Sequence, residues 1–433
     1  MRTLVKKLIP RSLFRKIEPI GHLGEAVLVN VLEGFPSKGL KVIGVTGTNG
    51  KTTTAFLIHR MLHEAGYKVG LITTVAYGVG DDIKPQMTHM TTPGVRTLTK
   101  RIKAMRAKGI EWLVLETTSH ALAQHRVWSV PYTISVLTNI THEHLSYHGT
   151  FERYIEAKRQ LFVLTNKNQA GLQIGIVNAD DPNADVFAGS IKHPVLFGTG
   201  QADIRATNIK MSPTGVSYDA VHDDKKYHIE CKLPGSFNVY NSLAAVAVGE
   251  AVGLSKSQIE KGIAALSGVE GRMTHIDEGQ DFTVLVDYAH TPDSFEKLFR
   301  DMKPVVKGKL IVLFGSLGGG DESKREIQGR LAGEYADEVI ITEEDDRKED
   351  PARIRQMIVA GAESAGKVLD KDLFVINERP EAISFAMRRA KKGDTVMLLG
   401  KGHEKTIEHA DGEHPWDESA EARRALKKLK KRK

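Results

Sequence analysis

Two kinds of segment alternate along most of the chain. Short runs rich in β-branched and other apolar residues, typical of buried strands, are separated by longer segments whose apolar positions have helical spacing. This alternation predicts a parallel sheet covered by helices, which is an α/β fold. The first series has predicted strands at residues 41–45, 69–73, 112–116, 133–138 and 175–178, and predicted helices at residues 52–64 and 95–108.

The pattern changes between residues 202 and 233, where the helical spacing disappears. Short polar strands separated by turns predict a small antiparallel β appendage there. A helix is expected at residues 238–252, and a second alternating series follows it. The predicted strands of this second series, each followed by a helix, lie at residues 283–286, 310–314, 338–342, 373–376 and 395–399.

These patterns predict an α/β protein in three parts. Residues 1–40 form a short basic amphipathic segment. Residues 41–268 form a central domain, with a parallel sheet and the antiparallel appendage. Residues 269–433 form a Rossmann-like α/β C-terminal domain that ends in a basic tail.

The first forty residues are too few for a domain of usual size. Two interpretations of them stay open. The segment is either a helix that docks on the main body or a helix that lies on a membrane surface. Its basic residues, which could meet anionic lipid, are Lys6, Lys7, Arg11, Arg15 and Lys16.

Composition excludes several function classes. Of 433 residues, 61 are lysine or arginine and 54 are acidic, and Lys427–Lys433 alone holds six of the positive charges. Because the remainder is close to neutral, we expect no nucleic-acid partner, which would need positive charge spread over a folded face. Cys231 is the single cysteine, which excludes intramolecular disulfides and cysteine zinc clusters. No apolar run is long enough to span a bilayer, and we expect a cytoplasmic protein.

A glycine-rich loop joins the first predicted strand to the first helix. Glycines there let backbone N–H groups face phosphates, a lysine reaches the terminal phosphates, and a threonine hydroxyl can hold Mg²⁺. Val45 stands where the usual pattern has its first glycine, five residues before Gly50. The loop still predicts nucleotide binding, and with it a central domain of the P-loop ATPase type. Its residues are Gly47, Thr48, Asn49, Gly50, Lys51, Thr52 and Thr53.

Polar residues follow two other predicted strands of the same sheet. Glu116 ends one strand, and Asn139 ends another and leads into His142, His144 and His148. Ligands of parallel sheets lie beyond the carboxyl ends of the strands, so we expect Glu116 and His144 near the loop phosphates. A carboxylate and an imidazole could complete a divalent-cation site. Mg²⁺ or Mn²⁺ suits a phosphate loop, and zinc is the rival interpretation of the histidines.

An ordered set of motifs over residues 41–418 resembles the bacterial Mur ligases. Within the family, the motifs are most similar to the members that add the third residue of the muramoyl peptide. The matching segments are Gly47–Thr53, Glu116–His120, Gln124–Val127, Asn139–Gly149, Tyr154–Lys158, Leu233–Asn238, Gly271–Met273, Asp287–Pro292 and Gly400–Glu404.

The resemblance implies ATP-dependent formation of an amide bond. ATP would phosphorylate a carboxylate of UDP-MurNAc-L-Ala-D-Glu, and the amine of an incoming amino acid would then attack the acyl phosphate. Lys51 and metal ions would make the meeting of two anions tolerable. The expected partners are therefore a UDP-muramoyl-dipeptide and an amino acid, in peptidoglycan precursor synthesis, and we expect a monomer.

The resemblance also implies roles for single residues. Thr52 and Glu116 would bind one Mg²⁺ and His144 a second, and Lys158 matches the lysine that the family carbamylates. As a bare lysine on a helix, Lys158 would otherwise be interpreted as solvated. The residues expected to face the nucleotide are Asn238, Arg272, Asp287 and His290. The residues expected to hold the acceptor are Thr91, Thr92, Ser119, Gln124 and Arg126.

The segment expected to select the amino acid departs from the family pattern. Members that add meso-diaminopimelate carry Asp-Asn-Pro-Arg, whereas this chain has Glu344, Asp345, Asp346 and Arg347. Arg347 could pair with a substrate carboxylate, and the extra acids could favour an amine. The amino acid therefore stays open among meso-diaminopimelate, L-lysine and others. Further expected contacts are Arg325, Gly400 and Glu404.

A second departure concerns the family's usual N-terminal domain, which grips the uridine nucleotide. Only forty residues precede Lys41, so we expect that domain to be missing. Uridine would then be recognised by the short segment or by a partner or membrane, or else the muramoyl-peptide end alone would hold the acceptor. Two other functions stay open: a ligase like folylpolyglutamate synthase, and a nucleotide-binding scaffold without catalysis.

Overall fold

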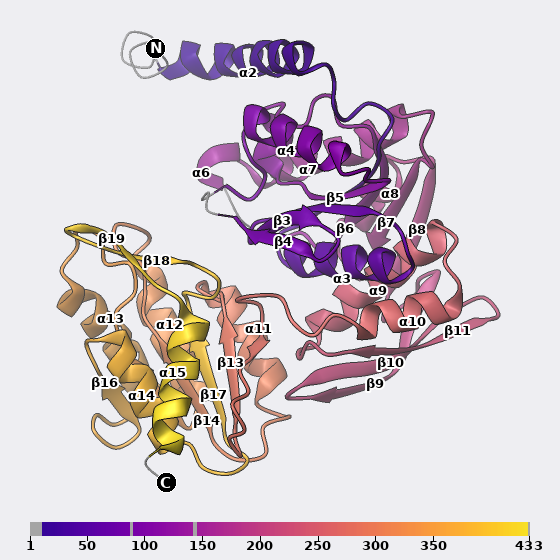
Figure 1. The fold of residues 1–433 in the computed structure, drawn as a ribbon. Helices are drawn as coiled ribbons and strands as arrows, with labels where there is room; N and C mark the ends of the chain where they lie inside the picture. The colour runs from indigo at the N-terminus through magenta and orange to yellow at the C-terminus, as the bar shows by residue number, and fades with distance from the viewer. Residues whose placement is uncertain (1–10, 87–89, 142–144, 432–433) are drawn as a thin grey trace. The chain divides into compact units, whose positions relative to one another are not determined.

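The computed structural model of the chain describes residues 11–86, 90–141 and 145–431. The chain divides into two compact units (Figure 1). Unit 1 comprises Met1–Ile209, Ser217–Cys231 and Phe237–Leu266. Unit 2 comprises Lys210–Val216, Lys232–Ser236 and Ser267–Lys433.

One large sheet organises the first two thirds of the chain. Among the described residues it has eleven strands in the order β11-β10-β9-β8-β7-β6-β1-β5-β2-β3-β4. Its middle strands are parallel, as predicted, since β1 pairs in parallel with both β5 and β6. The strands are β1 (Lys41–Thr46), β2 (Val69–Ile72), β3 (Ala76–Val79), β4 (Asp82–Pro85), β5 (Trp112–Glu116), β6 (Tyr132–Leu137), β7 (Ile174–Asn178), β8 (His193–Gly198), β9 (Ile204–Ser212), β10 (Gly215–His222) and β11 (Lys225–Cys231).

The central strands are buried on both faces, which is why their sequences are almost continuously apolar. Tyr132, Leu161 and Phe162 lie in the core formed between this sheet and its helices. Gly44 has no side chain because a Cβ there would lie 2.6 Å from the Tyr132 ring. The helices of this part are α2 (Arg11–Glu33), α3 (Lys51–Glu64), α4 (Val95–Ala107), α5 (Ser119–Ala123), α6 (Leu145–His148), α7 (Phe151–Lys167), α8 (Ala184–Ala188), α9 (Phe237–Ala251) and α10 (Lys256–Ala264).

The strands predicted as a separate antiparallel appendage differ from expectation in one respect. β9, β10 and β11 lie where they were predicted, but they extend the main sheet, because β9 pairs in parallel with β8 through Phe197 and Gly198. The hairpin of β3 and β4 at the opposite edge was not predicted. Antiparallel or polar strands therefore extend the parallel centre of the sheet at both of its edges.

Helix α2 packs on α4 at the outside of unit 1 (Figure 1). Ala26 and Val29 contact Val95, and Asn30 and Ser129 hydrogen-bond between their side chains. The N-terminal segment therefore contains a helix that contacts the main body, as one of the two interpretations expects.

Unit 2 has its own sheet. Among the described residues it contains six strands in the order β12-β13-β17-β14-β15-β16, of which only β12 runs antiparallel to its neighbour. The strands are β12 (Thr274–His275), β13 (Thr283–Asp287), β14 (Leu310–Phe314), β15 (Glu338–Ile341), β16 (Leu373–Val375) and β17 (Thr395–Leu399). Their apolar faces form a core with Ile383, Met387 and Leu426. The predicted second α/β fold is confirmed.

Helices cover both faces of this sheet, and a hairpin follows β17. α11 begins with a capping box of Thr291 and Ser294 and with Pro292 in its first turn, which fixes its start directly after the β13 loop. The helices are α11 (Pro292–Met302), α12 (Ser323–Tyr335), α13 (Pro351–Ser364), α14 (Arg379–Arg389) and α15 (Glu418–Lys430). The hairpin consists of β18 (Thr406–His409) and β19 (Gly412–Pro415).

Candidate functional site

The loop after β1 holds two glycines in conformations that other residues rarely adopt. Gly47 has φ 145° and Gly50 has φ 82°. A Cβ on Gly47 would lie 1.9 Å from Thr138 Oγ1, and one on Gly50 would lie 2.3 Å from Asn241 Oδ1. Both positions therefore require glycine. They turn the chain from β1 directly into α3, whose first-turn N–H groups have no intrahelical acceptor.

Neighbouring elements hold this loop in place. The N–H of Asn49 donates to Asn139 Oδ1 at 3.0 Å, and Asn139 Nδ2 donates back to the Asn49 carbonyl at 3.0 Å. Thr138 Oγ1 donates to the same carbonyl at 2.6 Å. On the other side, the hydroxyl of Thr48 lies 3.0 Å from that of Tyr154 on α7. The end of β6 and the helix α7 thus fix the loop.

Two lysines converge on one carbonyl group of the loop. Lys51 Nζ donates to the carbonyls of Gly47 and Thr48 at 3.0 and 2.8 Å. Lys158, buried on α7, donates to the same Gly47 carbonyl at 2.5 Å and lies 4.7 Å from the centre of the Tyr154 ring. Because two ammonium groups at one oxygen repel each other, this position favours an anion between or beside them.

A carboxylate and a hydroxyl meet at the start of α3. β1 and β5 pair in parallel with Val45 opposite Glu116, which brings the Glu116 carboxylate to the first turn of the helix. Thr52 Oγ1 donates to Glu116 Oε2 at 2.9 Å. Thr74 donates to the two carboxylate oxygens through its N–H at 2.9 Å and its hydroxyl at 3.0 Å. Glu116 itself is buried.

These groups fit a nucleotide phosphate with a hard cation. The loop offers backbone donors and a lysine to the phosphates, and Thr52 and Glu116 offer the oxygen ligands that Mg²⁺ prefers. Within the described ranges, no group of three or more His, Cys, Asp and Glu side chains could hold a metal by itself. A cation here would therefore need phosphate or water oxygens as well. His144, predicted as a second ligand, lies outside the described residues.

The residues predicted to hold the acceptor lie next to this loop, beyond β5. The hydroxyl of Thr92 donates to the Glu116 carbonyl at 2.9 Å, and Arg126 Nη1 donates to the Thr92 carbonyl at 2.8 Å. Arg126 also donates to Gln124 Oε1 at 2.9 Å, and burial lowers the pKa of its guanidinium. Ser119 Oγ lies 3.0 Å from His148 Nε2. Thr91 is part-buried beside Thr92.

Asn238 is the second residue of α9, which packs against α3. Asn241, one turn later, donates to Asn238 Oδ1 at 2.9 Å and accepts from the hydroxyl of Thr54 at 3.2 Å. Asn241 is also the residue that leaves no room for a side chain at Gly50. The predicted nucleotide residue Asn238 is thus tied through Asn241 to the phosphate loop.

In unit 2, the predicted nucleotide residues gather where β13 ends. Asp287 accepts the N–H groups of Met273 and Ala289, each at 2.8 Å. Burial raises the pKa of Asp287, against the opposing charge of Arg272. The Arg272 guanidinium lies 4.9 Å from the centre of the Tyr288 ring, and its buried Nε has no partner among the described residues. This combination of aromatic ring, guanidinium and carboxylate fits recognition of a nucleotide.

His290 follows in the same loop. Its Nδ1 lies 2.8 Å from the Tyr288 carbonyl, and its own carbonyl accepts Gln328 Nε2 at 2.9 Å. The Tyr288 ring also contacts the ring of His403, whose pKa burial lowers to about 3. His403 is therefore neutral near pH 7 and adds no positive charge to this cluster.

Glu344 and Gly400 meet at the carboxyl edge of the unit 2 sheet. A Cβ on Gly400, which has φ 100°, would lie 2.4 Å from Glu344 Oε2. Burial raises the pKa of Glu344 to about 7, while Arg379 and Lys401 oppose that rise. Near pH 7, Glu344 is therefore poised between its neutral and charged forms.

The rest of the predicted specificity segment is paired with the residues after β17. Asp345 Oδ1 accepts Lys401 Nζ at 2.6 Å, and Lys401 also pairs with Glu404 at 2.7 Å. Asp346 lies 2.9 Å from His409 Nδ1 on β18. Arg347 pairs with Glu408 of the same strand at 3.1 Å. This arrangement brings five acids close together: Glu344, Asp345, Asp346, Glu404 and Glu408.

Arg325 is fully buried and has a protein partner. Its Nη1 and Nη2 donate to the two oxygens of Glu349 at 2.6 and 2.8 Å, and Nη2 also donates to the Leu317 carbonyl at 3.0 Å. This pairing lowers the pKa of Glu349 to about 2. Arg325 thus fixes the segment after Arg347 through Glu349.

Comparison with known proteins decides the family. Residues 45–249 match the family model of the Mur ligase middle domain, and residues 271–402 match that of the Mur ligase glutamate ligase domain. A protein from Roseiflexus sp. (strain RS-1), named UDP-N-acetylmuramyl-tripeptide synthetase, is 40% identical over 423 residues, covering 95% of this chain and 83% of that protein. The chain belongs to the Mur ligase family.

Two further comparisons agree with this membership. The UDP-N-acetylmuramoyl-L-alanyl-D-glutamate--2,6-diaminopimelate ligase of Geobacillus thermodenitrificans (strain NG80-2) is 39% identical over 415 residues, covering 95% of this chain and 84% of that protein. A solved structure with the same enzyme name is 30% identical, with a TM-score of 0.68, and covers 94% of this chain and 81% of that chain. The fold of this Mur ligase is therefore that of its relatives.

The sequence analysis gave no role to four residues that shape these sites. Thr74 supports Glu116 from a loop whose own pattern carried no chemical signal, and Tyr154, which begins a matching segment, supports Thr48 from α7. Glu349 and His409 hold the specificity segment. The acid-rich run that ends at Pro351 could have pointed to Glu349, whereas nothing in the sequence pattern links His409 to Asp346.

Proposed function

We propose that this Mur ligase uses ATP to join an amino acid, through an amide bond, to UDP-MurNAc-L-Ala-D-Glu in peptidoglycan precursor synthesis. The observation that carries the proposal is the convergence of Lys51, Thr52, Glu116 and Lys158 around the Gly47–Thr53 loop. A protein that only bound a nucleotide would need neither a buried lysine behind the loop nor a carboxylate on Thr52.

The loop and its neighbours would hold the nucleotide. The N–H groups of the Gly50–Thr53 turn and Lys51 would hold the phosphates, and Thr52 and Glu116 would bind Mg²⁺. When bound, ATP with Mg²⁺ supplies a phosphoryl group that converts a carboxylate, which is a poor electrophile, into one with a good leaving group. Within unit 2, Arg272 beside the Tyr288 ring offers a cation and Asp287 offers an acceptor, which are groups that suit a nucleotide.

Lys158 would act as its carbamate. The ammonium first gives up one proton to water. The neutral amine then attacks CO₂, an N–C bond forms as one C–O π bond breaks, and a second proton leaves, so that the cation becomes an anionic carbamate. The structure supports this step physically, since Lys51 already contacts the same Gly47 carbonyl and a second buried ammonium there is unfavourable. The carbamate would pair with Lys51 and support the metal ions, including any held by His144.

Different residues would bind the acceptor and the amino acid. Arg126, held in a fixed direction by Gln124 and Thr92, offers a cation to the acceptor's carboxylate. We assign a diamino acid as the incoming substrate. Arg347 offers a fork for a carboxylate, and the acids around Glu344 and Asp346 offer partners for a distal amine.

A direct assay tests the proposal. The purified chain is incubated with ATP, Mg²⁺, UDP-MurNAc-L-Ala-D-Glu and one amino acid at a time, including meso-diaminopimelate and L-lysine, and ADP release and product mass are measured. UDP-MurNAc-L-Ala, which lacks the accepting residue, is the matched control. We expect one diamino acid to give a product with one added residue, from a monomeric cytoplasmic enzyme.

Two results would favour other functions. ATP binding without product for any amino acid would point to the non-catalytic scaffold. Glutamate addition to a folate acceptor, with no activity on the muramoyl peptide, would point to a ligase like folylpolyglutamate synthase.

A further inference from the structure

Helix α2 exposes apolar side chains on the face that points away from the body of the protein. The exposed fractions are 71% for Ile20, 54% for Leu28, 56% for Val31 and 72% for Leu32. At 100° per residue these four positions span about 120° of the helix surface, on the side opposite Ala26 and Val29, which pack on α4. Single exposed apolar residues are ordinary, but four on one helix face are not.

No charged residue interrupts this face. Over residues 20–33, the positions on the same arc besides the four apolar ones are Gly21 and Gly24. Glu25 lies at its margin and Glu33 lies on the side toward α4, and they pair with Arg96 and Lys103 of α4. These ion pairs and the contacts of Asn30 hold the helix with its apolar arc outward.

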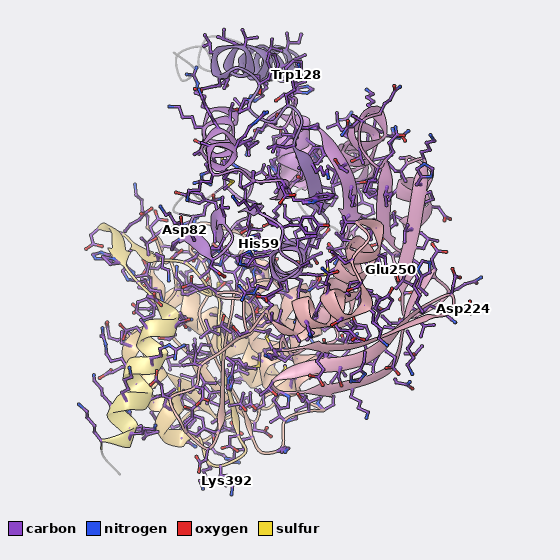
Figure 2. The ribbon with its side chains drawn as sticks, turned by 45° about the vertical axis from the view of Figure 1, so that its right-hand side comes forward. His59, Asp82, Trp128, Asp224, Glu250 and Lys392 are labelled. Atoms are coloured by element: carbon purple, nitrogen blue, oxygen red, sulfur yellow. The ribbon has the colours of Figure 1, made fainter. Side chains whose placement is uncertain are left out.

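Two aromatic residues beyond the end of α2 are also partly exposed. Phe35 is 37% exposed and Trp128 is 39% exposed, and their ring centres lie 6.5 Å apart. Figure 2 places Trp128 beside the helix. Tryptophan is enriched where a protein meets the boundary between lipid and water. We call the set Ile20, Leu28, Val31, Leu32, Phe35 and Trp128 the α2 face.

The charge of residues 1–16, which precede the α2 face, indicates what binds to that face. Residues 1–16 contain six lysines and arginines and no acidic residue. Anionic lipid attracts such a segment electrostatically. A second copy of the chain would instead bring six like charges to the same place. No described helix is long and apolar enough to cross a membrane, so the helix would lie in the membrane surface.

We propose that the α2 face docks this Mur ligase on an anionic lipid membrane, with the apolar side chains in the interface and the basic segment on the lipid headgroups. This proposal does not depend on the ligase reaction. It adds the membrane surface as a binding partner, and binding there would concentrate the enzyme on that surface.

Vesicle flotation of the full chain tests the proposal. One set of vesicles is pure phosphatidylcholine, and the other contains half phosphatidylglycerol. We expect the chain to float with the anionic vesicles only. The Leu28→Glu/Leu32→Glu variant should lower the partition coefficient at least tenfold, and Lys6→Gln/Lys7→Gln should lower it on the order of tenfold. The control is Val368→Glu/Leu369→Glu, which changes two comparably exposed apolar residues of unit 2 and should bind like the wild type.

A second measurement covers the case in which the glutamate variant fails to fold. Leu32→Trp keeps the face apolar, and the fluorescence emission of the added tryptophan should shift to shorter wavelength when anionic vesicles are present. The proposal is overturned if the wild type stays unbound, if Leu28→Glu/Leu32→Glu binds equally, or if Leu32→Trp shows no shift. A dimer that Leu28→Glu/Leu32→Glu abolishes, without vesicle binding, would assign the face to a second copy and also overturn it.

Discussion

Lys51 and Lys158 donate hydrogen bonds to one acceptor, the carbonyl oxygen of Gly47, at 3.0 and 2.5 Å. The first lysine comes from α3, after the loop, and the second comes from the buried side of α7. Two like charges at one oxygen repel each other, and an anion beside them offsets that repulsion. This relationship is the physical basis for both the phosphate site and the proposed carbamate.

Changing Lys158 tests that basis. Lys158→Ala should reduce turnover by at least a thousandfold, because the carbamate that supports the metal ions cannot form, and added bicarbonate should not restore it. The control is Lys167→Ala, an exposed lysine on the same helix, which should retain activity. Steady-state rates of ADP release measure both variants. A fully active Lys158→Ala enzyme would refute the carbamate role.

Glu116 is expected to act through the metal ion. Glu116→Gln keeps the shape of the side chain and the contact with the hydroxyl of Thr52, but it removes the negative charge that attracts Mg²⁺. We expect a lower kcat and a several-fold higher Mg²⁺ concentration for half-maximal activity, measured by Mg²⁺ titration. Glu64→Gln, at the exposed end of α3, is the control. An unchanged Mg²⁺ dependence would exclude Glu116 as a metal ligand.

The backbone conformation of Gly47 predicts that a side chain at this position disrupts the loop. Gly47→Ala would place a Cβ 1.9 Å from Thr138 Oγ1 in a backbone with φ 145°, so the loop must move and ATP affinity should fall at least tenfold. Gly66→Ala is a control for backbone strain alone, since Gly66 has φ 96° and no heavy atom within 4 Å of the added Cβ. It should lose about 1 kcal/mol of stability and keep its ATP affinity. Calorimetric ATP titration compares the two, and equal affinities would contradict the loop assignment.

Arg347 is expected to serve the amino acid alone. Arg347→Ala should raise the KM for the amino acid at least tenfold and leave the KM for ATP within about twofold, because a lost charge-assisted hydrogen bond is worth roughly 1.5–3 kcal/mol. Arg353→Ala, an exposed arginine of α13 that pairs with Glu322, is the control. Equal effects on both KM values would remove Arg347 from the amino-acid pocket.

Glu344 predicts a pH dependence of stability. Burial raises the pKa of Glu344 to about 7, so the folded chain binds this proton more tightly than the unfolded chain does. The stability due to this group is complete below the unfolded pKa of about 4.3 and is lost as the pH rises through 7. Glu344→Gln should therefore gain about 2 kcal/mol in free energy of unfolding, relative to wild type, between pH 5 and pH 8.

Urea unfolding at the two pH values measures this difference. Glu363→Gln, which changes an exposed glutamate of α13, should show no such gain. If wild type and Glu344→Gln keep a constant difference in unfolding free energy from pH 5 to pH 8, the carboxyl group of Glu344 titrates normally.

The sequence by itself determined the central strands and the residues at their ends. Strands such as Lys41–Thr46 and Trp112–Glu116 were predicted to within a residue or two, because a strand buried on both faces must be apolar throughout. The loop Gly47–Thr53 and Glu116 were predicted for a related reason. Polar residues that interrupt such runs stand at the carboxyl edge, where ligands of parallel sheets bind.

Only the tertiary structure decided the position of Lys158 and the extension of the sheet by β9. Lys158 has the pattern of a solvated helix residue, and it is buried only because α7 packs with that side against the loop of β1. The pairing of β9 with β8, and of Asp346 with His409, joins segments whose own patterns are polar. Local patterns record which residues avoid water, whereas the choice of partner between distant segments depends on packing and hydrogen bonds that form only in the folded chain.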